Sequence, residues 1–531
     1  ENFAQLQLNY RKDFGKHGIS AMGAYEYSSS VEQFVSINSI PPTNYSPQMA
    51  LLEVNGLTDD YTILKRASFV GRFNYDYKQK YLLELLGRYD GTHLYAAGKR
   101  WGLFPGVSAG WRISQEDFFR NNIRVITNLK LRASWGRTGQ ERGVTPFDYL
   151  AGGNFRSGSY VFDGGLVPGT GIRGLPITSV TWVTSTAKNI GLDFGLFNNK
   201  LTGEFDAFIR ELSGIPTARY DVLLPSEVGY TLPSENLNSE ITKGIEGIIT
   251  YANKVGAIGY TISVNATLGR RKILDIYKPR FGNSWDEYRN AIANRWANIN
   301  WGYRVEGQFQ STDQIKNWPV NNDGQGNRTQ LPGDLIFKDE NGDGMISNLD
   351  ERPIGYALGA TPYMSFGGSI GVNYKGLSLM TDWAGGTMQS YYRIFELAIP
   401  FQAIHNAPEY LFNDRWHRAD LFDPNSAWIP GKYPAIRRTG SGNHINYTRR
   451  SDYWITNVNY VRLKNLEIAY NLPKKLLSKA HLSGVRIYCT GTNLFSFDNV
   501  KHIEIDPEIA FNSGLVYPSV RVYTFGINLT L

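Results

Sequence analysis

The fold is decided by residues 333–386, which read GDLIFKDENGDGMISNLDERPIGYALGATPYMSFGGSIGVNYKGLSLMTDWAGG. Residues 364–374 alternate between large apolar side chains and small or polar ones, and a tight Lys375-Gly376 turn leads into a return strand. Because side chains on a β-strand point to opposite faces with a period of two, this hairpin has one apolar face and one polar face. The stretch therefore predicts a sheet with an apolar side and a wet side.

The same alternation recurs along the whole chain and predicts roughly 14–16 strands. Short turns alternate with long polar loops, the longest of which are expected at 141–180, 311–362 and 386–455. A short helix is expected within 272–300, and a change of phase after Leu463 predicts a β-bulge near Lys464-Asn465. Unequal connections at the two ends are typical of outer-membrane barrels, whereas a soluble β-sandwich usually has similar loops at both ends. The pattern thus favours an all-β fold, a transmembrane antiparallel β-barrel.

Composition agrees with this fold and argues against several functions. The 531 residues are 14% aromatic and include 55 glycines, which suits strands, interfacial girdles and turns. The chain has no run of 18 apolar residues, so no transmembrane helix is expected, although barrel strands escape that test. A single cysteine, Cys489, excludes an internal disulfide and a cysteine-based metal cluster. The net charge of +7 is not gathered into a basic stripe, so no nucleic-acid partner is expected.

Residues 339–350, DENGDGMISNLD, match the spacing of a twelve-residue calcium-binding loop. Oxygen ligands are expected from loop positions 1, 3, 5, 7 (a backbone carbonyl), 9 and 12, which are Asp339, Asn341, Asp343, Met345, Ser347 and Asp350. Gly344 occupies the sharp turn, and an aspartate at position 12 has a shorter reach than the usual glutamate. The pattern predicts a structural Ca²⁺ that pins an external loop. The alternative is a loop folded by Asx turns without metal.

Aromatic and charged side chains supply further candidates for binding. Five tryptophans in or beside the long loops are candidates for stacking on sugars or contacting a partner, with loop or girdle packing as the alternative: Trp296, Trp301, Trp318, Trp416 and Trp428. Five charges on the polar face are candidates for lining a conduit, with a merely solvated face as the alternative: Arg72, Asp193, Glu204, Asp206 and Asp382. The seven histidines are scattered and no catalytic constellation stands out, so the chain is not expected to be an enzyme.

A series of motifs covers nearly the whole chain. They are RYDG at 88–91, RWGLFP at 100–105 with SAGWR at 108–112, LKLRAS at 129–134 with Gly136 and Thr138-Gly139, NIGLDF at 189–194, the 333–350 loop, VRLKNL at 461–466, TGTNLF at 490–495 and DPE at 506–508. In content and order they resemble the SusC/RagA-type TonB-dependent transporters of Gram-negative outer membranes.

The resemblance implies a 22-stranded barrel with a plugged lumen. It also implies import of glycan fragments or peptides, energised through TonB and assisted by a SusD-like surface lipoprotein that closes over the outer mouth. Residues 1–531 are then expected to be a C-terminal part of this barrel in contact with outer-membrane lipid, with roughly two thirds of its strands and long extracellular loops.

An incomplete barrel leaves two unpaired strand edges, which lipid does not tolerate. The plug, the TonB-contacting segment and the first strands are therefore expected from another chain or from an N-terminal part of the same protein outside residues 1–531. Two alternatives remain open at this point, a passive pore without a plug and a soluble β-rich glycan-binding protein.

Overall fold

The computed structural model describes residues 1–531 except 41–52, 173, 220–221, 223, 226, 228–229, 358–360, 402–405, 438–443, 478–481, 509–518 and 531. The chain forms two compact units. The first unit comprises residues 1–199, 204–244 and 271–295, and the second comprises 200–203, 245–270 and 296–531. Among the described residues, every helix is too short or too polar to cross a membrane.

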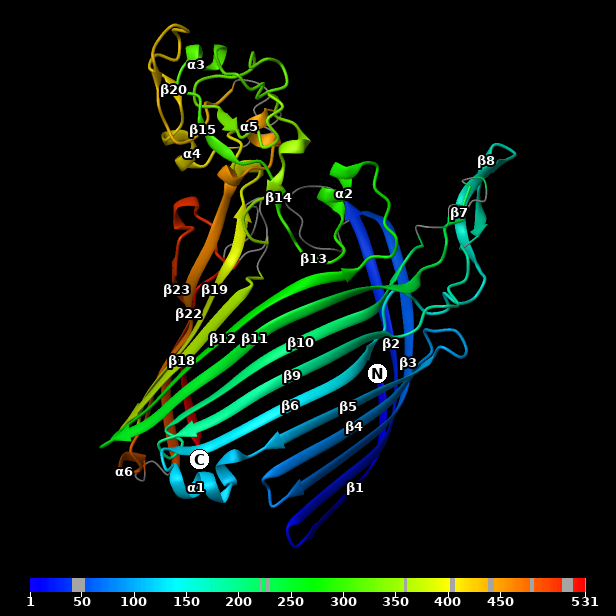
Figure 1. The fold of residues 1–531 in the computed structure, drawn as a ribbon, viewed down its shortest axis with the longest axis vertical. Helices are drawn as coiled ribbons and strands as arrows, with labels where there is room; N and C mark the ends of the chain where they lie inside the picture. Colours follow the sequence, from blue (N-terminus) through cyan, green and yellow to red (C-terminus); the bar gives the residue numbers. More distant parts are fainter. Residues whose placement is uncertain are drawn as a thin grey trace. The chain divides into compact units, whose positions relative to one another are not determined.

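The first unit is built on an antiparallel sheet in the order β1-β2-β3-β4-β5-β6-β9, drawn in blue to green in Figure 1. Its strands are β1 (Asn2–Phe14), β2 (His17–Ile40), β3 (Glu53–Tyr77), β4 (Tyr81–Thr92), β5 (Trp101–Trp111), β6 (Ile126–Gln140) and β9 (Val183–Leu196). Helix α1 (Asp117–Asn122) lies between β5 and β6. Short turns join β1 to β2 and β3 to β4, as the sequence predicted, so one end of these strands is marked by tight connections.

The connection from β6 to β9 differs from the expected irregular loop at 141–180. It contains a two-stranded hairpin, β7 (Gly153–Phe162) and β8 (Gly165–Ile172), which pairs from Phe162 opposite Gly165. The hairpin turns at Asp163-Gly164, where both residues have positive φ angles of 51° and 75°. The expectation of a plain loop was wrong, because an Asp-Gly pair strongly favours a two-residue hairpin turn.

Several elements contribute residues to both units or lie near the boundary in sequence. These are β10 (Leu201–Thr217), β11 (Glu235–Val255), β12 (Ile258–Asp275), α2 (Ser284–Asn290) and β13 (Arg295–Trp296). Helix α2 confirms the short helix predicted within 272–300, and its N-terminus is capped by the side chain of Asn283, which accepts a hydrogen bond from the amide of Asp286 at 2.8 Å.

The second unit pairs β12 with a sheet in the order β18-β19-β22-β23-β24, drawn in yellow-green to red in Figure 1. Its strands are β18 (Met364–Tyr374), β19 (Leu377–Tyr392), β22 (Ile455–Asn471), β23 (Gly484–Asp498) and β24 (Val522–Thr530). The β18–β19 hairpin turns at Lys375-Gly376 with φ angles of 44° and 91°, as predicted. The register between β22 and β23 shifts between Leu463 and Asn465, which confirms the predicted bulge.

The long loops of the second unit are not irregular throughout. They contain β14 (Trp301–Gly302), β15 (Val305–Gln308), α3 (Thr312–Lys316), β16 (Leu335–Phe337), β17 (Arg352–Pro353), α4 (Glu409–Asn413), β20 (His417–Arg418), β21 (Trp428–Ile429), α5 (Ile445–Thr448) and, beyond β22, α6 (Lys474–Leu477). These short elements pair locally, β14 with β17, β15 with β16 and β20 with β21. The loops therefore have tertiary structure of their own.

The apolar face that the alternation predicted is exposed. On β12 and β18, Ile262, Val264 and Ile370 share one face and are 42%, 57% and 39% exposed. In a β-sandwich such residues would be buried between two packed sheets. Their exposure agrees with a sheet whose apolar side meets lipid.

Candidate functional site

The two longest loops of the second unit pack together into one body, here called the outer module and defined as described residues within 301–357 and 391–455. In Figure 1 its elements α3, α4, α5, β15 and β20 gather beyond the ends of β19 and β22 that lie opposite the Lys375-Gly376 turn. Separate clusters of buried side chains form its core, one around Trp454 and Leu411, another around Phe337 and Leu335. The module thus has a hydrophobic core of its own.

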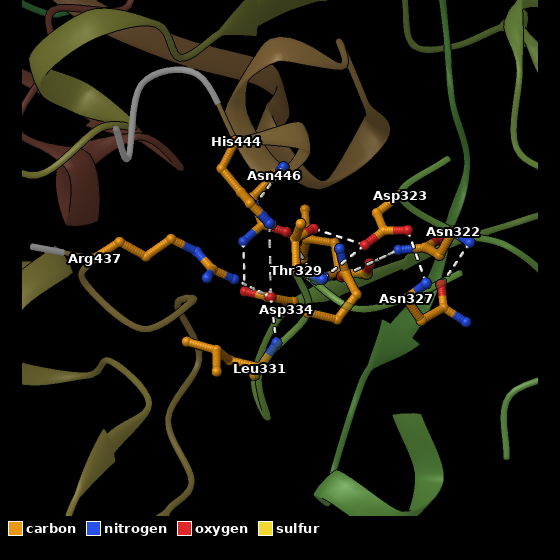
Figure 2. Close-up of polar contacts among 12 residues, drawn as sticks. Asn322, Asp323, Asn327, Thr329, Leu331, Asp334, Arg437, His444 and Asn446 are labelled. Atoms are coloured by element: carbon orange, nitrogen blue, oxygen red, sulfur yellow. Dashed lines mark hydrogen bonds and ion pairs between the residues drawn. The ribbon is translucent and has the colours of Figure 1, made fainter. Parts of the chain in front are cut away.

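The carboxylate of Asp334 joins the two loops at the centre of this module (Figure 2). Asp334 is fully buried and forms an ion pair with the guanidinium of Arg437. Its oxygens also accept hydrogen bonds from the backbone amide of Leu331 at 2.7 Å and from the side-chain amide of Asn446 at 2.8 Å. Asn446 in turn accepts a hydrogen bond from the amide of Leu335 at 3.0 Å. One buried carboxylate therefore ties β16 to a segment more than 100 residues away along the chain.

We call Asp334 and the residues that bind its carboxylate, Leu331, Arg437 and Asn446, the Asp334 clasp. The electrostatics of the Asp334 clasp follow from its burial. Burial raises the pKa of the Asp334 carboxyl above its ordinary value, and the Arg437 guanidinium opposes that shift. His444 lies 3.9 Å from the Asp334 carboxylate, and burial together with the nearby Arg437 lowers the pKa of His444 to about 4. Its Nδ1 accepts a hydrogen bond from the amide of Asn446 at 3.3 Å, so the ring is neutral with its proton on Nε2.

A second polar turn supports the clasp from the opposite side (Figure 2). The Asp323 carboxylate accepts hydrogen bonds from the amides of Gln325, Asn327 and Thr329 at 2.7–2.9 Å, which closes residues 323–329 into a compact turn. The neighbouring Asn322 is fully buried and exchanges hydrogen bonds with β16, donating to the carbonyl of Leu335 and accepting from the amide of Phe337. The polar groups of this turn are thus used to fix β16.

The 339–350 loop is folded by its own side chains around backbone amides. Asp339 accepts hydrogen bonds from Gly342 and Gly344 at 2.7 and 2.8 Å, and these amides lower the pKa of Asp339 against the opposing effect of burial. Gly344 has a φ of 80°, as the sharp-turn position requires. The buried Asp350 accepts from the amides of Glu340 at 2.9 Å and Ser347 at 2.7 Å. All these contacts fit an Asx-turned loop whether or not an ion is present.

Among the remaining predicted ligands, Asn341, Asp343 and Met345 are exposed. Asn341 and Asp343 hydrogen-bond to each other at 2.9 Å, and Asp343 accepts from the amide of Met345 at 2.9 Å. A bridge between Asn321 and Met345 joins the loop to the Asp323 turn. Over the described part of the chain, no group of three or more His, Cys, Asp or Glu side chains is gathered around one point. The calcium site therefore stays a prediction.

The five predicted tryptophans lie in different surroundings. Trp301 and Trp416 are buried within the outer module, and a side chain at Gly333 would collide with Trp416. Trp318 packs edge-on against Phe309, with ring centroids 5.7 Å apart, and Trp428 lies beneath the guanidinium of Arg418 at 4.4 Å.

Trp296 is the most exposed of the five, at 39%. It stacks on the guanidinium of Arg270, whose Cζ is 4.7 Å from the Trp296 ring and 4.8 Å from the ring of Tyr363. Sequence reasoning did not connect Arg270 with Trp296, because the two come together only in the fold. Contact of any of the five tryptophans with substrate stays a prediction.

The polar face of the first unit carries an ion-pair network that includes two of the predicted charges. Arg132 donates to Asp193 at 2.7 Å and forms two hydrogen bonds with Asp206 at 2.6 and 2.7 Å. Lys130 lies 3.4 Å from Asp193. Gly191 makes room for this network, because a Cβ there would lie 2.5 Å from the Arg132 guanidinium carbon. Arg132 and Gly191 belong to the LKLRAS and NIGLDF motifs, but their roles were not predicted.

The other predicted charges are placed separately. Arg72 lies 3.7 Å from Glu84, and Asp382 accepts a hydrogen bond from Asn465 at 3.5 Å. Glu204 is exposed on β10. These residues do not converge on a single point within either unit.

A further network on β22 was missed from the sequence. Arg462 is buried and binds Asp506 and Glu508, each at 2.7 Å, and Lys464 also binds Glu508 at 2.7 Å. The carbonyl of Pro507 accepts a hydrogen bond from the buried Gln389 at 3.0 Å. The DPE and VRLKNL motifs thus hold the segment after β23 against the wall formed by β19 and β22.

Known proteins with similar sequences are TonB-dependent receptors. The chain is 26% identical to TonB-dependent receptor P26 of Formosa agariphila over 98% of its own length and 52% of the relative's. It is also 26% identical to the TonB-dependent receptor SusC of Bacteroides thetaiotaomicron, over 87% of its own length and 43% of that protein. The chain thus spans about half the length of the relatives it matches. No protein-family model matches it.

Solved structures show the same fold. The RagAB peptide importer in its open-open state superposes with a TM-score of 0.75 at 20% identity, covering 100% of this chain and 54% of that one. A second structure of the RagAB peptide transporter gives a TM-score of 0.74 at 20% identity, covering 99% and 55%. These relatives are named as receptors and transporters rather than enzymes, in agreement with the expectation from the sequence. The resemblance inferred from the motifs is confirmed: this chain is similar over nearly its whole length to TonB-dependent receptors, which are outer-membrane proteins of Gram-negative bacteria, over 87% of its length to SusC among them, and its fold matches about half of the RagAB transporter chain.

Proposed function

We propose that this chain forms much of the wall of an outer-membrane importer for glycan fragments or peptides. The observation that carries the proposal is the division of the sheet into two faces, one exposed and apolar and the other lined by paired charges, with the packed outer module at one end of the second unit's strands. A wall of this kind suits a polar solute that crosses lipid. The TonB-dependent receptors and the RagAB peptide transporter among its relatives support the same role.

We further propose that the outer module contacts a SusD-like surface lipoprotein that closes over the mouth, and that TonB supplies the energy through parts of the protein outside residues 1–531. The module suits docking because it has its own hydrophobic core and the buried contacts of Asp334, which are features that favour a pre-organised surface.

Conductance in planar bilayers tests the importer against a passive pore. The full-length protein is expected to remain closed, because a plugged transporter does not pass ions steadily. Steady ohmic conductance would instead establish a porin.

Native mass spectrometry of the detergent-extracted complex tests the lid, and the expected result is a transporter with a bound lipoprotein. Calorimetric titration with oligosaccharides and with short peptides separates the two substrate classes, and recovery of a stable protein without detergent would refute a membrane role.

We also propose that the 339–350 loop binds one Ca²⁺. Its support is the spacing of oxygen-bearing residues along the loop and the positive φ of Gly344 at the turn position. Because three carboxylates do not converge here, the ion would rely also on the side-chain oxygen of Asn341, the hydroxyl of Ser347 and the backbone carbonyl of Met345. Calorimetry on the full-length protein is expected to show a Ca²⁺ heat that Asp343→Asn removes and that the exposed control Asp313→Asn retains. No heat from the wild-type protein would refute the site.

A further inference from the structure

The apolar face of the first unit ends in two cations. Along β6 and β9 the paired residues on this face run, from the short turn toward the long loop, Leu129–Phe194, Leu131–Leu192, Ala133–Ile190, Trp135–Lys188 and Arg137–Thr186. Leu131 and Ile190 are exposed, so this ladder faces outward from the sheet. Apolar pairs therefore give way to a tryptophan and then to Lys188 and Arg137 within a few residues.

The height of this change matches the edge of the hydrocarbon layer. β6 pairs with β9 from Ile126 onward, at the end of β9 where a short turn leads into β10. Trp135 comes nine residues after Ile126. At ~3.3 Å per residue and a strand tilt of ~40°, that distance spans about 23 Å along the membrane normal, against an apolar band of about 25 Å for outer-membrane barrels. Trp135 thus lies where interfacial aromatic side chains are found, and Arg137 and Lys188 lie at the level of lipid headgroups.

Both cations lack a carboxylate partner. Within the residues that the structure describes, neither Arg137 nor Lys188 forms a salt bridge, and Arg137 instead lies over the Trp135 ring with its Cζ 5.5 Å from the ring centroid. On the opposite face of the same strands, Lys130 and Arg132 are both paired with Asp193. The sheet therefore pairs Lys130 and Arg132 on one face, whereas the structure shows, over the residues it describes, no ion pair for Arg137 and Lys188 on the other.

The two side chains are placed so that both can reach one anion. Trp135 is directly opposite Lys188, so Arg137 and Lys188 are diagonal neighbours on adjacent strands. Diagonal neighbours are about 7–8 Å apart at the backbone, and long basic side chains can converge from that distance on a group between them. A guanidinium binds two oxygens of a phosphate in parallel, while an ammonium acts as a point charge beside it.

We propose that Arg137, Lys188 and Trp135 form a binding site for the phosphate of an anionic outer-leaflet lipid. Arg137 and Lys188 bind the phosphate oxygens, and the Trp135 ring packs on the first carbons below the headgroup. The lipid's acyl chains then lie on the exposed ladder of Leu131, Leu192 and Ile190. This inference rests on the outer-membrane location alone and does not depend on which solute the protein imports.

Native mass spectrometry of the full-length protein in detergent tests the site. The probes are bisphosphorylated lipid A and the same lipid after removal of its phosphates. The wild-type protein is expected to retain the phosphorylated lipid more strongly, and Arg137→Gln with Lys188→Gln to weaken its binding about 30-fold, since each basic residue near a membrane surface contributes about a fivefold effect. Equal binding of the two lipids, or equal binding by wild type and double variant, would overturn the proposal.

Two control variants and one competitor complete the experiment. Lys375→Gln removes one positive charge at the short-turn end of the second unit, over the ring of Tyr374, and should leave lipid binding unchanged. Arg137→Lys with Lys188→Arg keeps both charges and should retain most of the binding. Inorganic phosphate at millimolar concentration should not displace the lipid, and displacement would show that the site takes the free anion instead.

Discussion

Replacing Asp334 with alanine is expected to open the outer module locally while the strands stay paired. The substitution removes the acceptor for the Leu331 amide and the Asn446 side chain, and it leaves the guanidinium of Arg437 without its buried partner. Removing one member of a buried ion pair typically costs about 3–5 kcal/mol. Because the Arg437 side chain retains 17% exposure and can turn toward water, we expect a value near the lower end, about 3 kcal/mol.

Hydrogen exchange measured by mass spectrometry on the detergent-solubilised protein checks this value. Peptides that cover β16 and α5 should exchange about 150-fold faster in the variant, because a local opening free energy falls by the cost of the substitution. Asp313→Ala is the matched control, since Asp313 is exposed on α3 and no ion pair is lost there. Unchanged exchange in β16, or equally faster exchange in β19 and β22, would refute the clasp as a local tie.

Lowering the pH from 7 to 5 should weaken the outer module by about 2 kcal/mol, because unfolded His444 takes up a proton near pH 6.5 while burial and Arg437 hold its folded pKa at about 4. The contribution of neutral His444 is intact above pH 6.5 and is lost as the pH falls toward 4. The variant His444→Gln should therefore flatten the pH dependence, which is measured by hydrogen exchange corrected for intrinsic rates. An equal pH dependence in the variant would contradict this role of His444. Gly191→Ala should destabilise the first unit by about 2 kcal/mol, since its Cβ would displace Arg132 from charged hydrogen bonds. Urea unfolding in lipid vesicles measures this loss of stability. The control Gly136→Ala should be near neutral, because its Cβ would meet only Gly106 at 3.7 Å. Equal effects of the two substitutions would exclude the steric explanation.

The strands were predictable because their signal is local. The alternation along 364–374, the Lys375-Gly376 turn and the phase change at Leu463 each depend on residues that are neighbours in sequence, and the structure has all three. The β7–β8 hairpin carried a local signal too, in Asp163-Gly164, which was overlooked among the glycines of a long loop.

The contacts of the outer module could not be predicted in the same way. Asp334 and Asn446 are 112 residues apart, and neither the charge of Asp334 nor the place of Asn446 in the first turn of α5 indicates the other. Gly191 looked like one of many glycines on a polar strand face, and its role is visible only when the Arg132 side chain is in place beside it. Such pairings depend on the strand register and on loop packing, which single-sequence periodicity does not specify.

The polar faces of both units are rich in charge yet largely satisfied by their own pairs, Arg132 with Asp193 and Asp206 in the first unit, Arg462 with Asp506 and Glu508 in the second. A passing solute would have to break a short intramolecular hydrogen bond to gain one with these side chains. If the chain lines an importer as proposed, brief residence is the consequence, because such a wall would keep a polar cargo hydrated without holding it. Throughput would then be limited by events at the mouth rather than by adhesion along the walls.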